Sequence, residues 1–210
     1  MKKLIVILIC CSTALFVQAQ KKAVTETGDE VILYDDGTWK YVNDTDIENN
    51  EIPTNSKKFE KSDNSTFLLK STKLDVGVWL DTKKWSFKKA GDNPEAEYEL
   101  KLKIGDLYGM IISEKIEIPL KSLKGIALEN GKTAAPDLHI VKEEYRNVNG
   151  LTILLLQMNG TMQGIKFSYY GYYFSNSNGT VQFITYTSQN LLDEYKNDCE
   201  ELLNGLVEIK

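Results

Sequence analysis

The octapeptide LTILLLQM, residues 151–158, carries apolar side chains on both of its alternating faces. Because successive side chains of a β-strand point to opposite faces, a strand of this composition needs apolar cover above and below it. A strand with one face in water would alternate apolar and polar residues instead. The octapeptide therefore predicts a central strand in a sheet that is covered on both faces.

Three Asn-Gly pairs flank or follow this strand, at residues 149–150, 159–160 and 178–179. Asn-Gly favours the two-residue turn of a β-hairpin, because both residues tolerate positive φ there. Each pair lies between apolar runs. Together they divide residues 138–187 into four predicted antiparallel strands.

Further elements are predicted before this meander. The segment EAEYELKLKI, residues 95–104, alternates between apolar residues, which end with Ile104, and charged ones, which is typical of a strand with one wet face. Pro119 fits the first turn of a helix that carries Leu123 on its apolar face and ends near Gly131.

A last helix is predicted over residues 189–204, because its apolar residues step by three and four along the chain. This stripe consists of Leu192, Tyr195, Cys199, Leu202 and Leu206. Gly205 fits the end of such a helix. We therefore expect an α+β fold, in which an antiparallel meander is sandwiched by helices and preceded by a small N-terminal β-hairpin.

Residues 1–19 have the organisation of a signal peptide. Lys2 and Lys3 precede an apolar core, and small residues allow cleavage after Ala19. The alternative is a lipid anchor on Cys11, since the residues before it resemble a bacterial lipobox. We expect an exported protein, periplasmic or extracellular, without a transmembrane segment once the signal is removed.

The next residues, 20–42, are assigned to a β-hairpin. Asp36-Gly37 supplies its turn, and Trp39 and Tyr41 follow on one face. A lone hairpin is marginal in water, so this one needs to dock on its own chain or on a partner.

A change of composition separates the hairpin from the main domain. Residues 43–65 are rich in Asn, Asp, Glu, Lys and Ser and contain little to bury, which is typical of a flexible linker. The main domain is therefore assigned to residues 66–210.

Charge and cysteine content argue against several classes of function. The net charge is −5, and removal of the signal takes away only cations, so a nucleic-acid partner, which needs clustered cations, is not expected. Arg146 is the only arginine. Cys10 and Cys11 leave with the signal, so Cys199 remains alone and cannot form an internal disulfide.

Groups that could carry chemistry are few. His139 is the only histidine, and without further ligands it cannot make a zinc site. Cys199 lies in the apolar stripe of the last helix, where a buried thiol stays protonated and serves packing. Because the sequence contains no catalytic or phosphate-binding motif, we expect no enzyme activity, no cofactor and no metal site.

The aromatic run FSYYGYYF, residues 167–174, is the best candidate for a binding surface. Tyr170 and Tyr172 share one face of this predicted strand. If they are exposed, they could contact a protein or a sugar, together with Trp39 and Tyr41 of the hairpin. In a sheet covered on both faces, the same rings would be core residues. The sequence leaves both interpretations open.

The order of these elements resembles the PsbP-like family. The resemblance covers residues 63–210 and consists of Trp85 after an extended segment, a helix, a four-strand meander and a closing helix that ends in ELLNGLVEI. The family shares its fold with a eukaryotic nuclear-import factor that binds the GTPase Ran, which implies an α/β/α sandwich. Its members are mostly binding or assembly proteins without a common active site, so the resemblance implies no catalytic residue.

Three functions are compatible with these features. The first is a non-enzymatic binding or assembly module of the bacterial envelope, with an envelope protein as its partner. The second is a carrier of a small ligand, with a pocket between sheet and helix. The third is a hydrolase, for example of glycans, that uses two facing carboxylates such as Glu143 and another acid.

Overall fold

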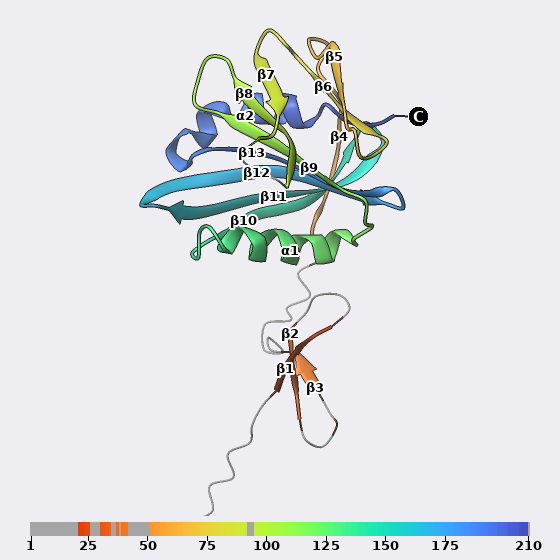
Figure 1. Cartoon of the computed structure of the whole chain (residues 1–210), viewed down its shortest axis with the longest axis vertical. Coiled ribbons are helices and arrows are strands. Elements are labelled where there is room, and N and C mark those ends of the chain that lie inside the picture. Colours follow the sequence, from red (N-terminus) through yellow and green to blue (C-terminus); the bar gives the residue numbers. More distant parts are fainter. Residues whose placement is uncertain are drawn as a thin grey trace, which may run out of the picture.

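The structure is a computed structural model that describes residues 21–25, 30–34, 37, 39–41, 51–91 and 95–209 (Figure 1). The expected signal peptide and the alternative lipid anchor on Cys11 lie outside the described residues.

An eight-stranded sheet with the strand order β4-β10-β11-β12-β13-β9-β8-β7 forms the main domain. Its strands are β4 (Thr54–Phe59), β7 (Trp85–Lys89), β8 (Ala96–Leu102), β9 (Tyr108–Glu114), β10 (His139–Val148), β11 (Leu151–Met162), β12 (Ile165–Asn176) and β13 (Gly179–Ser188). All neighbouring strands are antiparallel except β4 and β10, which are parallel. The edges of the sheet are therefore β4 and β7.

The predicted four-strand meander is present as β10 to β13, and two of its three turns lie where the Asn-Gly pairs placed them. Asn149 and Gly150 join β10 to β11 with φ angles of 50° and 86°, as a two-residue hairpin turn requires. Asn178 lies in the turn between β12 and β13, and Gly179 begins β13.

The prediction of a turn at Asn159-Gly160 is wrong, because both residues lie inside β11. The turn comes four residues later, where Gln163 and Gly164 adopt φ angles of 52° and 82°. Gly160 serves packing instead, since a Cβ atom there would lie 3.0 Å from Leu138 Cδ1. An Asn-Gly pair thus marks a site that tolerates a turn, whereas strand pairing decides whether the turn forms.

The central strand β11 is buried on both faces, as predicted. Ile153 and Leu155 belong to the hydrophobic cluster on one face of the sheet, and Leu154 and Leu156 belong to the cluster on the other. All four side chains are fully buried. Burial of such side chains contributes about 1.5–3 kcal/mol each.

The helix α1 (Leu120–Lys132) covers one face of the sheet, as Figure 1 shows. Pro119 precedes it, as expected, and Leu123 and Ala127 are its buried residues. These two side chains join the cluster that contains Leu154 and Leu156 of β11.

The opposite face is covered by α2 (Leu192–Leu203), which follows the short 3₁₀ helix η1 (Gln189–Leu191), and by a second, three-stranded sheet (Figure 1). The small sheet has the order β14-β6-β5 and consists of β5 (Phe67–Lys70), β6 (Val76–Leu80) and β14 (Leu206–Glu208). Helices therefore lie on both faces, as expected for the sandwich, but a β-layer that we did not predict shares one of them. Cys199 is a buried residue of α2, and burial raises the pKa of its thiol to about 11.

The prediction of a flexible linker over residues 43–65 is wrong for residues 54–59, which form the edge strand β4. This strand pairs with β10 through its backbone, and Phe59 is its only buried side chain. A strand that contributes hydrogen bonds but little apolar surface has the composition of a linker, so the main domain begins earlier than residue 66.

The strand predicted from residues 95–104 is β8, although it ends at Leu102. Ile104 was assigned to the apolar side but is 90% exposed, because the chain turns at Gly105 with a φ of 128°. On the polar side, Glu97 is buried and accepts hydrogen bonds from the hydroxyl groups of Ser71 and Thr72.

The N-terminal segment forms a small antiparallel sheet of its own, with the strands β1 (Lys21–Val24), β2 (Glu30–Leu33) and β3 (Trp39–Tyr41). The expected hairpin corresponds to β2 and β3, in which Leu33 pairs with Trp39. Gly37 has a φ of 81° and its N–H donates a hydrogen bond to Tyr34 O at 3.1 Å.

Gly205 tests how closely the small sheet packs against the end of α2. A Cβ atom at Gly205 would overlap the carbonyl oxygen of Trp79, a backbone atom that cannot rotate away. We predict that Gly205→Ala lowers the free energy of unfolding by about 2–3 kcal/mol, because the backbones must separate. Urea denaturation followed by circular dichroism measures this loss.

Gly125→Ala is the matched control, since nothing lies within 4 Å of a Cβ atom at this helical position. It should stabilise the protein by about 0.5–1 kcal/mol through helix propensity. Equal stability of the two variants would contradict the packing at Gly205.

Candidate functional site

The structure assigns the aromatic run on β12 mainly to the core. Tyr170 and Tyr172 are fully buried beneath α2 and cannot form an exposed contact surface, so that interpretation is wrong. The physical reason is the layer that covers this face of the sheet. The Tyr170 hydroxyl donates to Glu200 Oε1 at 2.7 Å, and the Tyr172 hydroxyl donates to Asn204 Oδ1 at 2.8 Å.

Arg146, the only arginine, lies at the centre of this buried contact and is 4% exposed. Its Nε donates to Glu144 Oε1 at 2.6 Å, and its Nη1 donates to Tyr172 Oη at 2.9 Å and to Glu200 Oε1 at 3.2 Å. The guanidinium carbon lies 4.3 Å from the centre of the Phe59 ring. We call Arg146, Glu144, Glu200, Tyr170 and Tyr172 the arginine cluster.

The arginine cluster holds its carboxylates in the ionised form. Burial alone would raise the pKa of Glu200, but the hydrogen bond from Tyr170 and the charge of Arg146 outweigh burial and lower it. For Glu144, burial is likewise outweighed by the hydrogen bond and charge of Arg146, so its pKa is also lowered. A general acid needs a raised pKa, so the cluster has the chemistry of a structural clasp between β10, β12 and α2.

Glu143, the acid predicted for a hydrolase, pairs with Lys124 of α1 at 2.6 Å. It therefore faces α1, on the opposite side of the sheet from Glu200 of α2. These two acids cannot act on one substrate, because the sheet separates them.

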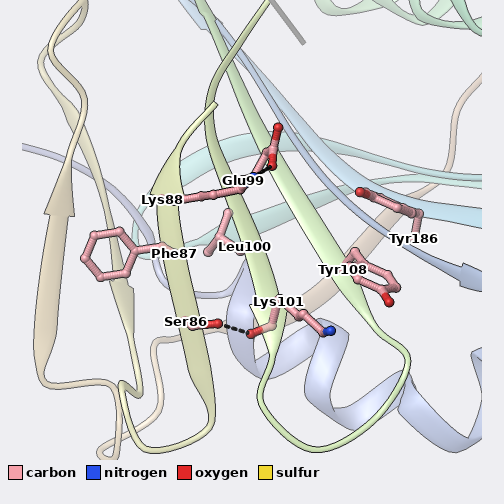
Figure 2. A pocket seen from close by; sticks show the side chains of 8 residues that line it. All are labelled: Ser86, Phe87, Lys88, Glu99, Leu100, Lys101, Tyr108 and Tyr186. Carbon is pink, nitrogen blue, oxygen red and sulfur yellow. Dashed lines mark hydrogen bonds and ion pairs between the residues drawn. The ribbon is translucent and has the colours of Figure 1, made fainter. Parts of the chain in front are cut away.

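A groove on the α1 side of the sheet, which we call the tyrosine groove, is the best candidate for a binding site (Figure 2). It has a volume of about 370 Å³ and is lined by Ser86, Phe87, Lys88, Glu99, Leu100, Lys101, Tyr108 and Tyr186. These residues come from β7, β8, β9 and β13, which are neighbours at one end of the sheet. The groove therefore runs across the strands.

Strand register builds the floor of the groove. Ser86 pairs with Lys101, Lys101 with Tyr108, and Tyr108 with Tyr186, and residues directly opposite each other share one face of a sheet. The row continues to Tyr169 on β12. Phe87 points to the other face, as its direction in Figure 2 shows.

The tyrosine rings in the groove stand against one another. The ring centres of Tyr108 and Tyr186 are 5.5 Å apart, with 19° between the planes, and Tyr169 meets Tyr186 edge-on at 6.1 Å. The ammonium of Lys101 lies 5.4 Å from the centre of the Tyr108 ring, on the side away from Tyr186. The broad ring faces are thus largely occupied, and the groove offers hydroxyl groups, ring edges and a cation.

Electrostatics keep these hydroxyl groups protonated at neutral pH. A hydrogen bond with Asp106, and then burial, raise the pKa of Tyr108. Burial, and then the charge of Glu99, raise the pKa of Tyr186. Lys88 Nζ pairs with Glu99 Oε2 at 2.9 Å on the floor of the groove. The Tyr186 hydroxyl can therefore donate a hydrogen bond to a ligand, and Lys101 can attract a negative charge.

The groove exists because α1 covers only part of its face of the sheet. The buried residues of α1 share a cluster with residues of β11 and β12, whereas β7 and β8 contribute none to it. Sequence reasoning missed Lys101, Tyr108 and Tyr186, because they lie on separate strands and only the register of the sheet brings them together. The single signal was the wet face predicted for β8, which includes Lys101.

The remaining candidate residues are not brought to this groove. His139 is exposed, and its Nδ1 lies 2.9 Å from Asp137 O. No group of three metal-binding side chains occurs among the described residues, and no helix within them is long and apolar enough to cross a membrane. Trp39 is exposed on β3, and Tyr41 ends the same strand.

No protein-family model matches the sequence, and no curated protein matches it. The solution structure of the PsbP protein CyanoP from Synechocystis sp. PCC 6803 is similar to this chain, with a TM-score of 0.52 and 14% identity over 68% of this chain and 91% of that one. The chain has a PsbP-like fold.

Two further solved structures have lower similarity to this chain. The first is PA94, a protein of unknown function from Pseudomonas aeruginosa, with a TM-score of 0.44 and 14% identity over 69% of this chain and 97% of that one. The second is LpqN of Mycobacterium tuberculosis, which is involved in cell envelope biogenesis, with a TM-score of 0.35 and 10% identity over 72% of this chain and 82% of that one. The similarity to CyanoP confirms the predicted PsbP-like fold, and at 14% identity it concerns the fold alone.

The arginine cluster leads to a prediction about pH. The pKa values of Glu144 and Glu200 are lowered in the folded state, so their stabilisation is complete above the ordinary value of 4.5 and is lost as the pH falls through the lowered values. We predict that Arg146→Met costs about 3 kcal/mol at pH 7, because two carboxylates lose their partner. The cost should decrease as the pH falls from 4.5 to 3, because the two carboxylates take up protons as the pH approaches their lowered pKa values.

Urea denaturation at pH 7 and pH 3 measures these differences. Lys132→Met is the control, since Lys132 pairs with the exposed Glu129 at 2.7 Å, and its loss should change stability by less than about 0.5 kcal/mol. An Arg146→Met cost that is the same at both pH values would show that the cluster acts through packing alone.

Proposed function

We propose that this chain is a non-enzymatic binding module of the bacterial envelope and that it contacts its partner through the tyrosine groove. The observation that carries the proposal is the uncovered end of the sheet, where Tyr108, Tyr186 and Lys101 line a groove of about 370 Å³. Tyrosine is enriched at protein interfaces, because one side chain offers both apolar area and a hydrogen-bonding hydroxyl.

The proposed envelope location is supported by the first nineteen residues, which carry the charge, apolar core and cleavage pattern of a signal peptide. The mature chain then acts in the periplasm or outside the cell. A lipid anchor through Cys11 is the alternative and would hold the same domain at a membrane surface.

Two other functions have less support. A hydrolase needs a carboxyl group with a raised pKa facing a second one, whereas Glu144 and Glu200 have lowered pKa values and are bound to Arg146. A carrier needs an apolar cavity of several hundred Å³. The cavity between the two sheets, lined by residues such as Leu69 and Leu206, has a volume of only about 10 Å³.

The N-terminal sheet is a second candidate contact. Trp39 is exposed there, and a sheet of three short strands gains stability when it docks on another surface. We propose that Trp39 and Tyr41 contribute to the binding of a partner by the full-length mature chain.

The groove is tested by capture from an envelope extract of the source bacterium. We predict that the mature chain enriches at least one envelope protein and that Lys101→Glu with Tyr186→Ala reduces this enrichment more than tenfold. The charge of the floor is then reversed and one aromatic side chain is lost. Quantitative mass spectrometry of the captured proteins measures the change.

Lys121→Glu is the control, because it makes the same charge change on the exposed surface of α1. It should capture the same proteins as the unmodified chain. If the groove variant and this control change the enrichment of the captured proteins equally, the groove is not the contact surface.

A further inference from the structure

The strand β7, at one edge of the eight-stranded sheet, has backbone groups that point away from the sheet. Two hydrogen bonds fix which ones: Lys103 N–H donates to Lys84 O at 2.8 Å, and Ala90 N–H donates to Glu97 O at 3.2 Å. Hydrogen-bonded and non-hydrogen-bonded pairs alternate along an antiparallel ladder. Even-numbered residues of β7 therefore point their backbone groups toward β8, and odd-numbered residues point theirs outward.

The outward-pointing residues at the exposed part of this edge are Phe87 and Lys89. Within the described part of the chain, β7 pairs only with β8, and neither residue has a further backbone hydrogen bond. Each can offer one N–H and one C=O to an added strand. An edge of this kind is a template on which an extended peptide can extend the sheet.

The other edge, β4, is less suited to such pairing. Its register with β10 shifts between Tyr145 and Asn147, and irregular edges are one way in which proteins hinder edge-to-edge association. The pairing of β7 with β8 is regular over five residue pairs, from Trp85 to Lys89. A regular edge presents evenly spaced hydrogen-bonding groups.

The two faces of β7 demand different side chains from an added strand. On one face, Phe87 stacks on Phe67 of β5, with 5.3 Å between the ring centres. The two side chains are 37% and 42% exposed. On the other face, Ser86 and Lys88 form the rim of the tyrosine groove. A strand beside β7 would place alternate side chains next to an apolar pair and next to the groove.

Charge defines the second kind of side chain. Lys88 and Lys101 line the groove, in a chain whose net charge is −5. Glu99 is the only acid among the residues that line the groove, and it pairs with Lys88. Asp106 contacts the groove through its hydrogen bond with Tyr108, so Lys101 is the cation that the groove offers to an acidic side chain.

We infer that β7 binds an extended segment of a partner protein in which acidic residues alternate with aliphatic ones. This inference rests on the proposed function and names the chemical class of the partner. Residues of the segment that lie opposite Phe87 and Lys89 make the backbone hydrogen bonds and place aliphatic side chains on the exposed phenylalanines. The residues between them place acidic side chains at Lys88 and Lys101.

The probe is an acetylated, amidated heptapeptide of alternating glutamate and valine that begins and ends with glutamate. Isothermal titration calorimetry with the full mature chain measures its dissociation constant. We expect saturable binding that a peptide with lysine in place of glutamate does not show. In ¹H–¹⁵N spectra, the amide signals of Phe87 and Lys89 should move most.

Lys89→Pro and Lys89→Ala form a matched pair for the edge. Proline removes the outward N–H but no hydrogen bond to β8, a position at which edge strands tolerate it. We expect Lys89→Pro to weaken binding at least tenfold relative to Lys89→Ala. Equal binding by both variants, or no binding of the probe by the unmodified chain, overturns the inference. Lys88 and Lys89 would then serve to protect the edge strand against pairing with other chains.

Lys101→Glu separates the inference from the proposed function. Weaker binding with both Lys101→Glu and Lys89→Pro supports edge and groove together. If only Lys89→Pro weakens binding, the edge is confirmed and the groove is not part of the contact. If only Lys101→Glu does so, the groove binds the acidic peptide without strand pairing, and the inference about the edge is wrong.

Discussion

The burial of β11 on both of its faces is the constraint that organises this domain. Ile153 and Leu155 on one side, and Leu154 and Leu156 on the other, all need apolar partners at the same place along the chain. Each face of the sheet must therefore carry its own covering layer near β11. The helix α1 supplies one layer, and α2 with the small sheet supplies the other. The need for cover decreases toward the edges, where β8 carries a partly buried Glu99 and an exposed Lys101.

The uneven need for apolar cover explains where the sheet leaves side chains accessible for binding. The meander is closed by packing and by the arginine cluster, in which Arg146 of β10 bonds to Glu200 of α2 and to Tyr172 of β12. The polar groups of the arginine cluster bind one another and are enclosed. At the end of the sheet formed by β7 and β8, no buried residue joins the cluster beneath α1, so side chains there remain accessible to a partner. Both the tyrosine groove and the unpaired backbone of β7 lie at this end.

The parts of the fold that the sequence predicts are those that depend on local pattern. The period-two alternation of β8, the stripe of α2 and the double burial of LTILLLQM all follow from side-chain spacing, and the structure contains them. Features set by pairing between distant segments were missed. Asn159-Gly160 lies within a strand because β11 and β12 continue to pair beyond it. The strand β4 has the composition of a linker because backbone groups make its hydrogen bonds. The tyrosine groove belongs to the same class, since four registers must be known before Lys101 and Tyr186 become neighbours.

Residue-resolved hydrogen exchange of the isolated mature chain, followed by NMR, tests the central claim most directly. A covered centre and an open edge predict that amides of residues 151–158 exchange slowest. Along β7, Ser86 and Lys88 should be protected by their bonds to β8, whereas Phe87 and Lys89 should exchange quickly. Fast exchange throughout residues 151–158, or uniform protection along β7, would contradict the account.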